Sequence, residues 1–294
     1  MATGTQTVTT VKPTERSKRR IGRFTRLMLY LFLIVFTLTY LMPFISAIVT
    51  SVRTQDDLSL NGVFSIPQEI VFENYPQAWT QGGVSRYLLN SFIITIPALA
   101  GTIFLSSLSA FALARFKFPG NRLIYFMYVA GTMLPFQILL LPVFLLSNTV
   151  GLYNTYWGVI MIHIAFQLGF CTFVLSNYMK TLPKELNEAA LVDGASVWMT
   201  FHRIIMPLMR PALAALTVLQ VTWIYNDFFW ALFLMGTGSK FPITSALNNL
   251  KGSFFADNNL LAAASLIIAL PTLIVFFALQ KQFVSGLTLG STKG

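Results

Sequence analysis

Long apolar stretches alternate with shorter polar segments along the chain after about residue 26. Each stretch is close to the roughly 20 residues that a helix needs to cross about 30 Å of hydrocarbon. The pattern predicts six membrane-spanning helices. They cover residues 27–49, 86–109, 122–146, 156–178, 211–235 and 261–280. Several contain proline or glycine, which membrane helices tolerate where neighbouring groups satisfy the freed backbone.

The predicted fold class is an all-α integral membrane protein with six transmembrane helices. A basic tail over 1–26 precedes the six-helix domain 27–280, and a second tail covers 281–294. Small residues around Gly101 in the second span, as in "GTIFLSSLSAFALA", predict a site where another helix packs closely.

Composition agrees with a membrane protein and excludes a soluble enzyme. Hydrophobic residues make up 55% of the chain and charged residues only 10%, whereas soluble domains carry about 25% charged residues. The single cysteine, Cys171, lies in an apolar run and excludes an intrachain disulfide.

The basic residues are distributed unequally between the two sides of the predicted membrane. Six spans place both termini on one side, and 16 of the 20 Lys and Arg residues fall there. Short loops rich in Lys and Arg stay in the cytoplasm, so both termini are expected to be cytoplasmic. The net charge of +10 is then a topology signal, and no nucleic-acid partner is needed to explain it.

Residues 179–210 form the largest polar segment on the cytoplasmic side and predict a helix–turn–helix. Pro183 stands at a helix start, Asp193-Gly194 is a turn signal, and Ser196 can cap a second helix. Two readings stay open from the residues alone: the segment docks on a protein partner, or it lies on the bilayer surface.

Three neighbouring residues suit the docking interpretation. Ala189 and Ala190 provide a shallow face on which a partner can come close, and Glu188 provides a charge for pairing. Pro207 and Pro211 are expected to break the chain before the fifth span.

Asp227 is the only acidic residue inside a predicted span. Carboxylates in membranes are costly and normally face a cavity or a partner. At helical spacing Trp223, Asp227 and Trp230 share a face, and polar groups beside aromatic rings suit a sugar. The alternative is a polar pair that locks the helix bundle. The candidate pathway residues are Trp223, Tyr225, Asn226, Asp227 and Trp230, with Gln137, His163 and Gln167 as weaker candidates.

No catalytic cluster, metal-ligand pattern or nucleotide-binding loop is present in the sequence. The string nearest to a phosphate-binding loop, "MGTGSKF" at 235–241, lacks the required spacing. The chain is therefore expected to bind no cofactor itself and to be no enzyme.

One pattern in residues 179–210 consists of Glu188-Ala189-Ala190, three residues, Gly194, nine residues, Ile204, one residue and Met206-Pro207. This pattern resembles the EAA loop of bacterial ATP-binding-cassette importer permeases. The departure is Met206 where the family has Leu. Further stretches resemble the carbohydrate branch and its maltose-transporter G-type subunit, so the resemblance covers nearly the whole chain. They are "FENYPQAW", "SAFALARFKFPGNR", "YNDFFWALFL" and "QKQFVSGLTLGSTKG". Tyr225 and Ala231 differ from the family's usual Trp and Pro.

The resemblance implies that residues 179–210 are the coupling helices of an importer permease in a bacterial inner membrane. Its implied coupling residues are Glu188, Ala189, Ala190, Asp193, Gly194 and Pro207. The implied partners are a second, F-type permease, two ATPase subunits that hold ATP and Mg²⁺, an extracytoplasmic sugar-binding protein, membrane lipid and the sugar itself. The binding protein would meet the outer segments 236–260 or 50–85.

Two other substrate or transport classes remain open at this point. Related importers carry glycerol phosphates or polyols. A proton-coupled secondary transporter using Asp227 is a rival class, although it assigns no role to the EAA-like loop and usually shows internal repeats.

Overall fold

The computed structural model describes residues 22–63, 65–80, 83–236, 238–245 and 257–288. Residues 1–21 and 289–294 of the two predicted tails, and 246–256 of the predicted outer loop, lie outside the described residues. The chain divides into two units, Met1–Ser46 and Ala47–Gly294. Helix α1 (Arg23–Ser51) begins in the first unit, is apolar along its length and contains Pro43.

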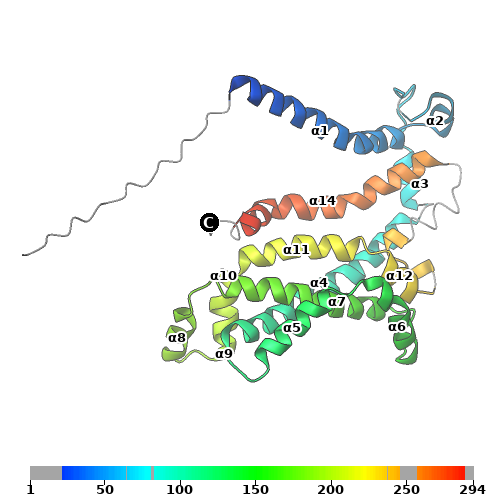
Figure 1. The fold of residues 1–294 in the computed structure, drawn as a ribbon. Coiled ribbons are helices and arrows are strands. Elements are labelled where there is room, and N and C mark those ends of the chain that lie inside the picture. The colour runs from blue at the N-terminus through cyan, green and yellow to red at the C-terminus, as the bar shows by residue number, and fades with distance from the viewer. Residues whose placement is uncertain (1–21, 64, 81–82, 237, 246–256, 289–294) are drawn as a thin grey trace, which may run out of the picture. The chain divides into compact units, whose positions relative to one another are not determined.

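Four helices form the centre of the second unit (Figure 1). α4 (Val84–Arg115) packs along α7 (Tyr156–Met179), and α11 (Arg210–Tyr225) packs against both α4 and α14 (Asn258–Thr288). α14 extends eight residues past the predicted end of the last span. Figure 1 shows α8 (Glu185–Val192) at one end of this bundle and α6 (Phe136–Thr149) at the other.

The remaining elements are short. They are α2 (Gln55–Asn61), α3 (Asn74–Thr80), α5 (Asn121–Thr132), α9 (Val197–Met199), the π-helical turn η1 (Thr200–Ile205), α10 (Met206–Leu208), α12 (Phe229–Leu234) and the 3₁₀ turn η2 (Gly238–Lys240).

The predicted close approach at Gly101 is confirmed. A Cβ atom added there would lie 2.5 Å from Cδ1 of Ile164 on α7, which is far inside van der Waals contact. A side chain at this position would have to displace the Ile164 side chain, so the α4–α7 interface favours glycine there, as close membrane helix pairs commonly do.

Two of the predicted spans are broken helices. The span predicted at 122–146 consists of α5 and α6, bent by 101° before Pro135. The span predicted at 211–235 consists of α11 and α12, separated by residues 226–228. Within the described residues, four helices are long and apolar enough to cross a membrane. Two bent pairs, Asn121–Thr132 with Phe136–Thr149 and Val197–Leu208 with Arg210–Tyr225, raise the number to as many as six if each pair is one span. An all-helical membrane fold is thus confirmed.

A buried arginine closes the segment that follows α1. Arg53 is fully buried, and its Nε donates to Asp57 Oδ2 at 2.8 Å in an ion pair. The other guanidinium N–H groups donate to the carbonyl oxygens of Gly62 and Asp57 and to Ser65 Oγ. The hydrogen bond from Arg53 lowers the pKa of Asp57 from 3.8 to about 2, against the opposing effect of burial. Arg53 therefore ties Asp57, Gly62 and Ser65 together around one guanidinium.

Candidate functional site

Gly194 ends α8 in a Schellman turn, which makes the predicted helix–turn–helix a defined structure. Its φ is +78°, in the left-handed region. The N–H of Ala195 donates to Ala190 O at 2.9 Å, and the N–H of Gly194 donates to Leu191 O at 3.1 Å. This pair of bonds satisfies carbonyl groups that the end of a helix leaves unpaired. The Asp193-Gly194 turn prediction is confirmed.

The second helix of the loop is capped as the sequence predicts and is anchored in the bundle. Ser196 Oγ accepts the Met199 N–H at 3.2 Å at the start of α9. In η1, Phe201 and Ile205 are buried in a cluster with Leu175 of α7. The loop is therefore a rigid extension of the membrane helices, and the chain turns by 76° before α11.

Most of the predicted coupling residues lie on the surface of the loop. Glu188, Ala189, Asp193 and Pro207 are exposed. Ala190 is buried, with 5% of its surface accessible, so the prediction that it offers a partner-facing surface is wrong. The reason is that α8 packs back onto η1, which covers that side of the helix.

The same loop exposes large apolar side chains on both sides of the turn. Val192 is 87% exposed, and its apolar neighbours are also exposed. These neighbours are Leu191, Val197, Trp198 and Met199. Large exposed apolar side chains gathered in one short loop are typical of an interaction site.

Asp227 lies in the break between α11 and α12 and caps the start of α12. Its Oδ1 accepts the Trp230 N–H at 3.4 Å, and its Oδ2 accepts the Ala231 N–H at 3.2 Å. A carboxylate at this position satisfies unpaired backbone donors and favours the positive end of the helix dipole. The hydroxyl of Thr244 donates to the carbonyl oxygen of Asp227, which ties the break to the following segment.

One weaker pathway candidate does meet Asp227. His163 Nε2 on α7 lies 3.6 Å from Asp227 Oδ2, and His163 is buried. Both residues line a pocket together with Ser91, Thr95 and Tyr225, and this pocket is too small to hold a water molecule. The arrangement places an imidazole, a carboxylate and hydroxyl groups within one polar site among the membrane helices.

The shared face predicted for Trp223, Asp227 and Trp230 is wrong. α11 ends at Tyr225, so helical spacing does not continue to Asp227. Trp223 is 47% exposed and its ring contacts Phe170, whereas Trp230 is buried. The carboxylate side chain stabilises a new helix start and thereby interrupts the period on which the prediction depended.

The other predicted pathway residues are separated from this pocket or have structural contacts. The Tyr225 hydroxyl donates to Ile268 O on α14 at 3.0 Å. Asn226 is exposed and donates from Nδ2 to Thr222 O. Gln167 is buried on α7, and Gln137 is exposed in the first turn of α6.

Two polar residues on α4 belong to the site but were missed from the sequence. Asn90 Nδ2 donates to Phe241 O at 2.9 Å, and its Oδ1 accepts from the Tyr156 hydroxyl at 2.7 Å. Ser91 Oγ accepts the N–H of Ile243 at 2.9 Å. The sequence feature that could have indicated them is an Asn-Ser pair inside an apolar span. These two residues hold residues 238–245 against the bundle beside Asp227 through hydrogen bonds.

Among the residues that the structure describes, no group of three His, Cys, Asp or Glu side chains is placed to hold a metal ion. The pocket beside Asp227 brings hydrogen-bonding groups together but has no room for a water molecule in this structure. The exposed apolar side chains around Gly194 provide a surface that another protein or the bilayer could cover.

Comparison with known proteins identifies the family to which this helical bundle belongs. Residues 102–288 match the model of the binding-protein-dependent transport system inner membrane component. The chain belongs to this family. It is therefore a permease of the inner membrane that crosses the bilayer several times.

Curated relatives extend the similarity over nearly the whole chain. A diacetylchitobiose uptake permease, NgcG of Streptomyces coelicolor, is 32% identical over 88% of this chain and 86% of its own length. The permease GgtD of Synechocystis, which serves uptake of osmoprotective compounds, is 34% identical over 98% of this chain and 99% of its own length. The alpha-glucoside permease AglG of Rhizobium meliloti is 37% identical over 78% of this chain and 62% of its own.

A solved structure shares the fold. One chain of a bacterial ABC transporter that imports the acidic polysaccharide alginate aligns with a TM-score of 0.79. The alignment covers 90% of this chain and 99% of that chain, at 23% identity.

Proposed function

We propose that this chain is a transmembrane subunit of an ATP-driven importer for a sugar or oligosaccharide that an extracytoplasmic binding protein delivers. The observation that carries the proposal is the family membership together with relatives named for diacetylchitobiose, alpha-glucosides, and melibiose, raffinose and stachyose. His163 and Asp227 provide hydrogen-bonding groups among the membrane helices, and a pathway that opens beside them would suit a substrate rich in hydroxyl groups.

The chain supplies the membrane pathway and a partner hydrolyses ATP. A second, F-type permease pairs with it, and two ATPase subunits with bound ATP and Mg²⁺ dock on the cytoplasmic loop 179–210. Both termini are cytoplasmic, because the basic residues are concentrated on that side. No catalytic role is assigned to this chain.

The loop around Gly194 transmits movement of the ATPase subunits to the membrane helices. Exposed Val192 and Trp198 provide an apolar surface that a partner's cleft would cover, and Glu188 provides a charge beside it. Because η1 is buried against α7, a displacement of this loop moves the bundle with it. ATP binding would close the ATPase pair and turn the pathway outward, and hydrolysis would reset it.

The test is reconstitution with the cognate subunits in liposomes and a panel of sugars. Uptake and ATP hydrolysis should both depend on the binding protein and on one class of sugar. Uptake that continues without ATP and is abolished by Asp227→Asn would instead establish the proton-coupled alternative.

A second candidate substrate is a polyol or a glycerol phosphate. The relative named for osmoprotective compounds, which matches over almost the full length of both chains, favours including it in the same panel. If a polyol stimulated ATP hydrolysis and uptake and no sugar did, the substrate would be a polyol instead of a sugar. The proposed importer mechanism would be unchanged.

A further inference from the structure

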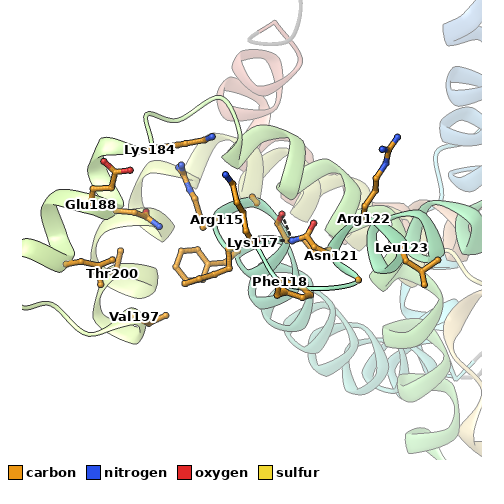
Figure 2. A pocket seen from close by; sticks show the side chains of 17 residues that line it. Arg115, Lys117, Phe118, Asn121, Arg122, Leu123, Lys184, Glu188, Val197 and Thr200 are labelled. Atoms are coloured by element: carbon orange, nitrogen blue, oxygen red, sulfur yellow. Dashed lines mark hydrogen bonds between the residues drawn. The ribbon is translucent and has the colours of Figure 1, made fainter.

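A cavity of about 820 Å³ lies beside the loop 179–210, outside the site at Asp227. Its walls come from two parts of the chain: the end of α4 with the α4–α5 connection, and α8 with the start of η1 (Figure 2). The transport mechanism described above gives this cavity no role.

The two walls are held in a fixed relation by side-chain hydrogen bonds. Arg115 at the end of α4 donates from Nη1 to Leu182 O at 3.2 Å, just before α8. Asn121 donates from Nδ2 to Phe116 O at 2.9 Å and to Leu113 O at 3.2 Å, which fixes the α4–α5 connection. The cavity is therefore a built feature of the fold.

The charge of the lining is strongly positive. Its cationic residues are Arg115, Lys117, Arg122 and Lys184, and Glu188 is the acidic residue among the described lining. In Figure 2 the charged ends of Arg115, Lys117 and Lys184 point toward the same side of the pocket. Arg115 Nε and Nη2 have no hydrogen-bond partner among the described residues. Such an excess of donors matches a phosphate group, which accepts charge-assisted hydrogen bonds from several cations.

Exposed apolar side chains stand beside these cations. Phe116, Phe118 and Leu123 come from the α4–α5 wall, and Leu191 and Val197 come from the loop wall. α4 is a candidate membrane span and the cavity adjoins its last residues, so it lies near the level of the lipid headgroups. Basic pockets at the cytoplasmic ends of membrane helices are suited to anionic lipid headgroups.

We propose that this cavity binds a phosphate group, supplied by an anionic phospholipid of the cytoplasmic leaflet. The phosphate would bridge Lys117 on one wall and Lys184 on the other, with an acyl chain along Phe116 and Phe118. A bound lipid would then stiffen the junction between the bundle and the loop that carries Glu188. The assignment rests on the proposed function for the cytoplasmic position of this end of the bundle.

The test is native mass spectrometry of the delipidated, assembled importer with three added probes: phosphatidylglycerol, phosphatidylcholine and inorganic phosphate. The variant is Lys117→Gln/Lys184→Gln. Both lysines are exposed, so the fold should be retained. The matched control is Arg26→Gln/Lys281→Gln, which removes two exposed cations outside the pocket. With each cation near the surface worth about 1 kcal/mol, the pocket variant should bind phosphatidylglycerol roughly 30-fold more weakly.

Each result has a definite meaning. Selective binding of phosphatidylglycerol that the pocket variant loses and the control keeps supports the lipid as the source. Binding of inorganic phosphate with the same dependence supports the phosphate site and assigns it a soluble source. Equal binding by the wild type and the pocket variant, or none by either, overturns the proposal. The same spectrum also shows whether ATPase subunits are present, so failure of the proposed function is seen separately.

Discussion

The turn at Gly194 provides the sharpest test of the coupling mechanism. A side chain at φ +78° meets no steric obstacle in this chain, because no atom lies within 4 Å of a Cβ placed there. The effect of Gly194→Ala therefore arises from the backbone alone. An L-residue in the left-handed conformation costs about 1–2 kcal/mol. This cost should lower the ratio of molecules with the turn formed to molecules with the turn disrupted roughly 5- to 30-fold.

Asparagine tolerates this conformation better than alanine does and serves as the matched control. Gly194→Ala should reduce substrate-dependent uptake by the reconstituted importer more than Gly194→Asn does. ATP hydrolysis should become less dependent on substrate in the same order. Equal impairment by Ala and Asn would show that the left-handed backbone is not the reason for glycine at this position.

Substitution of Gly194 by a large residue distinguishes an effect on docking of the ATPase from an effect on folding. Gly194→Trp adds bulk where the isolated chain has open space, so membrane insertion and thermal stability should change little beyond the backbone cost. Uptake should collapse if an ATPase subunit covers this surface. Normal uptake by Gly194→Trp would falsify the coupling role of the loop.

Three further predictions concern the rest of the bundle. Asp227→Ala should destabilise the protein by about 1 kcal/mol through loss of the α12 cap, and Asp227→Asn should retain most of this stability, as a thermal shift will show. The pKa of Asp57 is lowered to about 2, so its pairing with Arg53 stabilises the loop after α1 above about pH 4, and this stabilisation is lost as the pH falls toward 2. Proteolysis of residues 53–65 should therefore accelerate across that window, and Asp57→Asn should remove the pH dependence. Gly101→Ala should cost about 1–3 kcal/mol by overpacking against Ile164, with recovery in Gly101→Ala/Ile164→Ala.

Each of these has an opposing result. Equal thermal shifts for Asp227→Ala and Asp227→Asn would remove the cap as the reason for the carboxylate. A proteolysis rate that is unchanged between pH 4 and 2 would contradict the Asp57 ion pair. Failure of Ile164→Ala to rescue Gly101→Ala would show that the helices meet elsewhere.

The pattern of apolar stretches and the interactions between residues close in the sequence were sufficient to predict part of the fold. The roughly 20-residue length of the apolar spans follows from bilayer thickness, so the spans could be located without any tertiary information. The ends of α8 and α9 depend on Gly194 and Ser196, whose effects reach only a few residues along the chain. These elements were therefore predicted correctly.

The faces and breaks of the helices could not be derived in the same way. Asp227 interrupts the fifth span because it caps α12 and because Thr244, 17 residues later, donates to its carbonyl group. Ala190 is covered by η1, and Asn90 is joined to Phe241 across 151 residues. Contacts between residues so far apart in the sequence leave no pattern in either segment that would predict them. A membrane helix tolerates a break only where groups from elsewhere in the fold satisfy the freed backbone, so the break depends on these contacts.

The sequence by itself determined that this protein is a helical membrane protein with a capped helix–turn–helix, since span length and helix caps are local properties. Only the tertiary structure decided where polar groups meet. It brought His163 to Asp227 and joined the end of α4 to the segment before α8, so that Arg115 and Lys184 line one cavity. The physical reason is that buried polar groups must find partners, and in a bundle of apolar helices those partners come from distant parts of the chain.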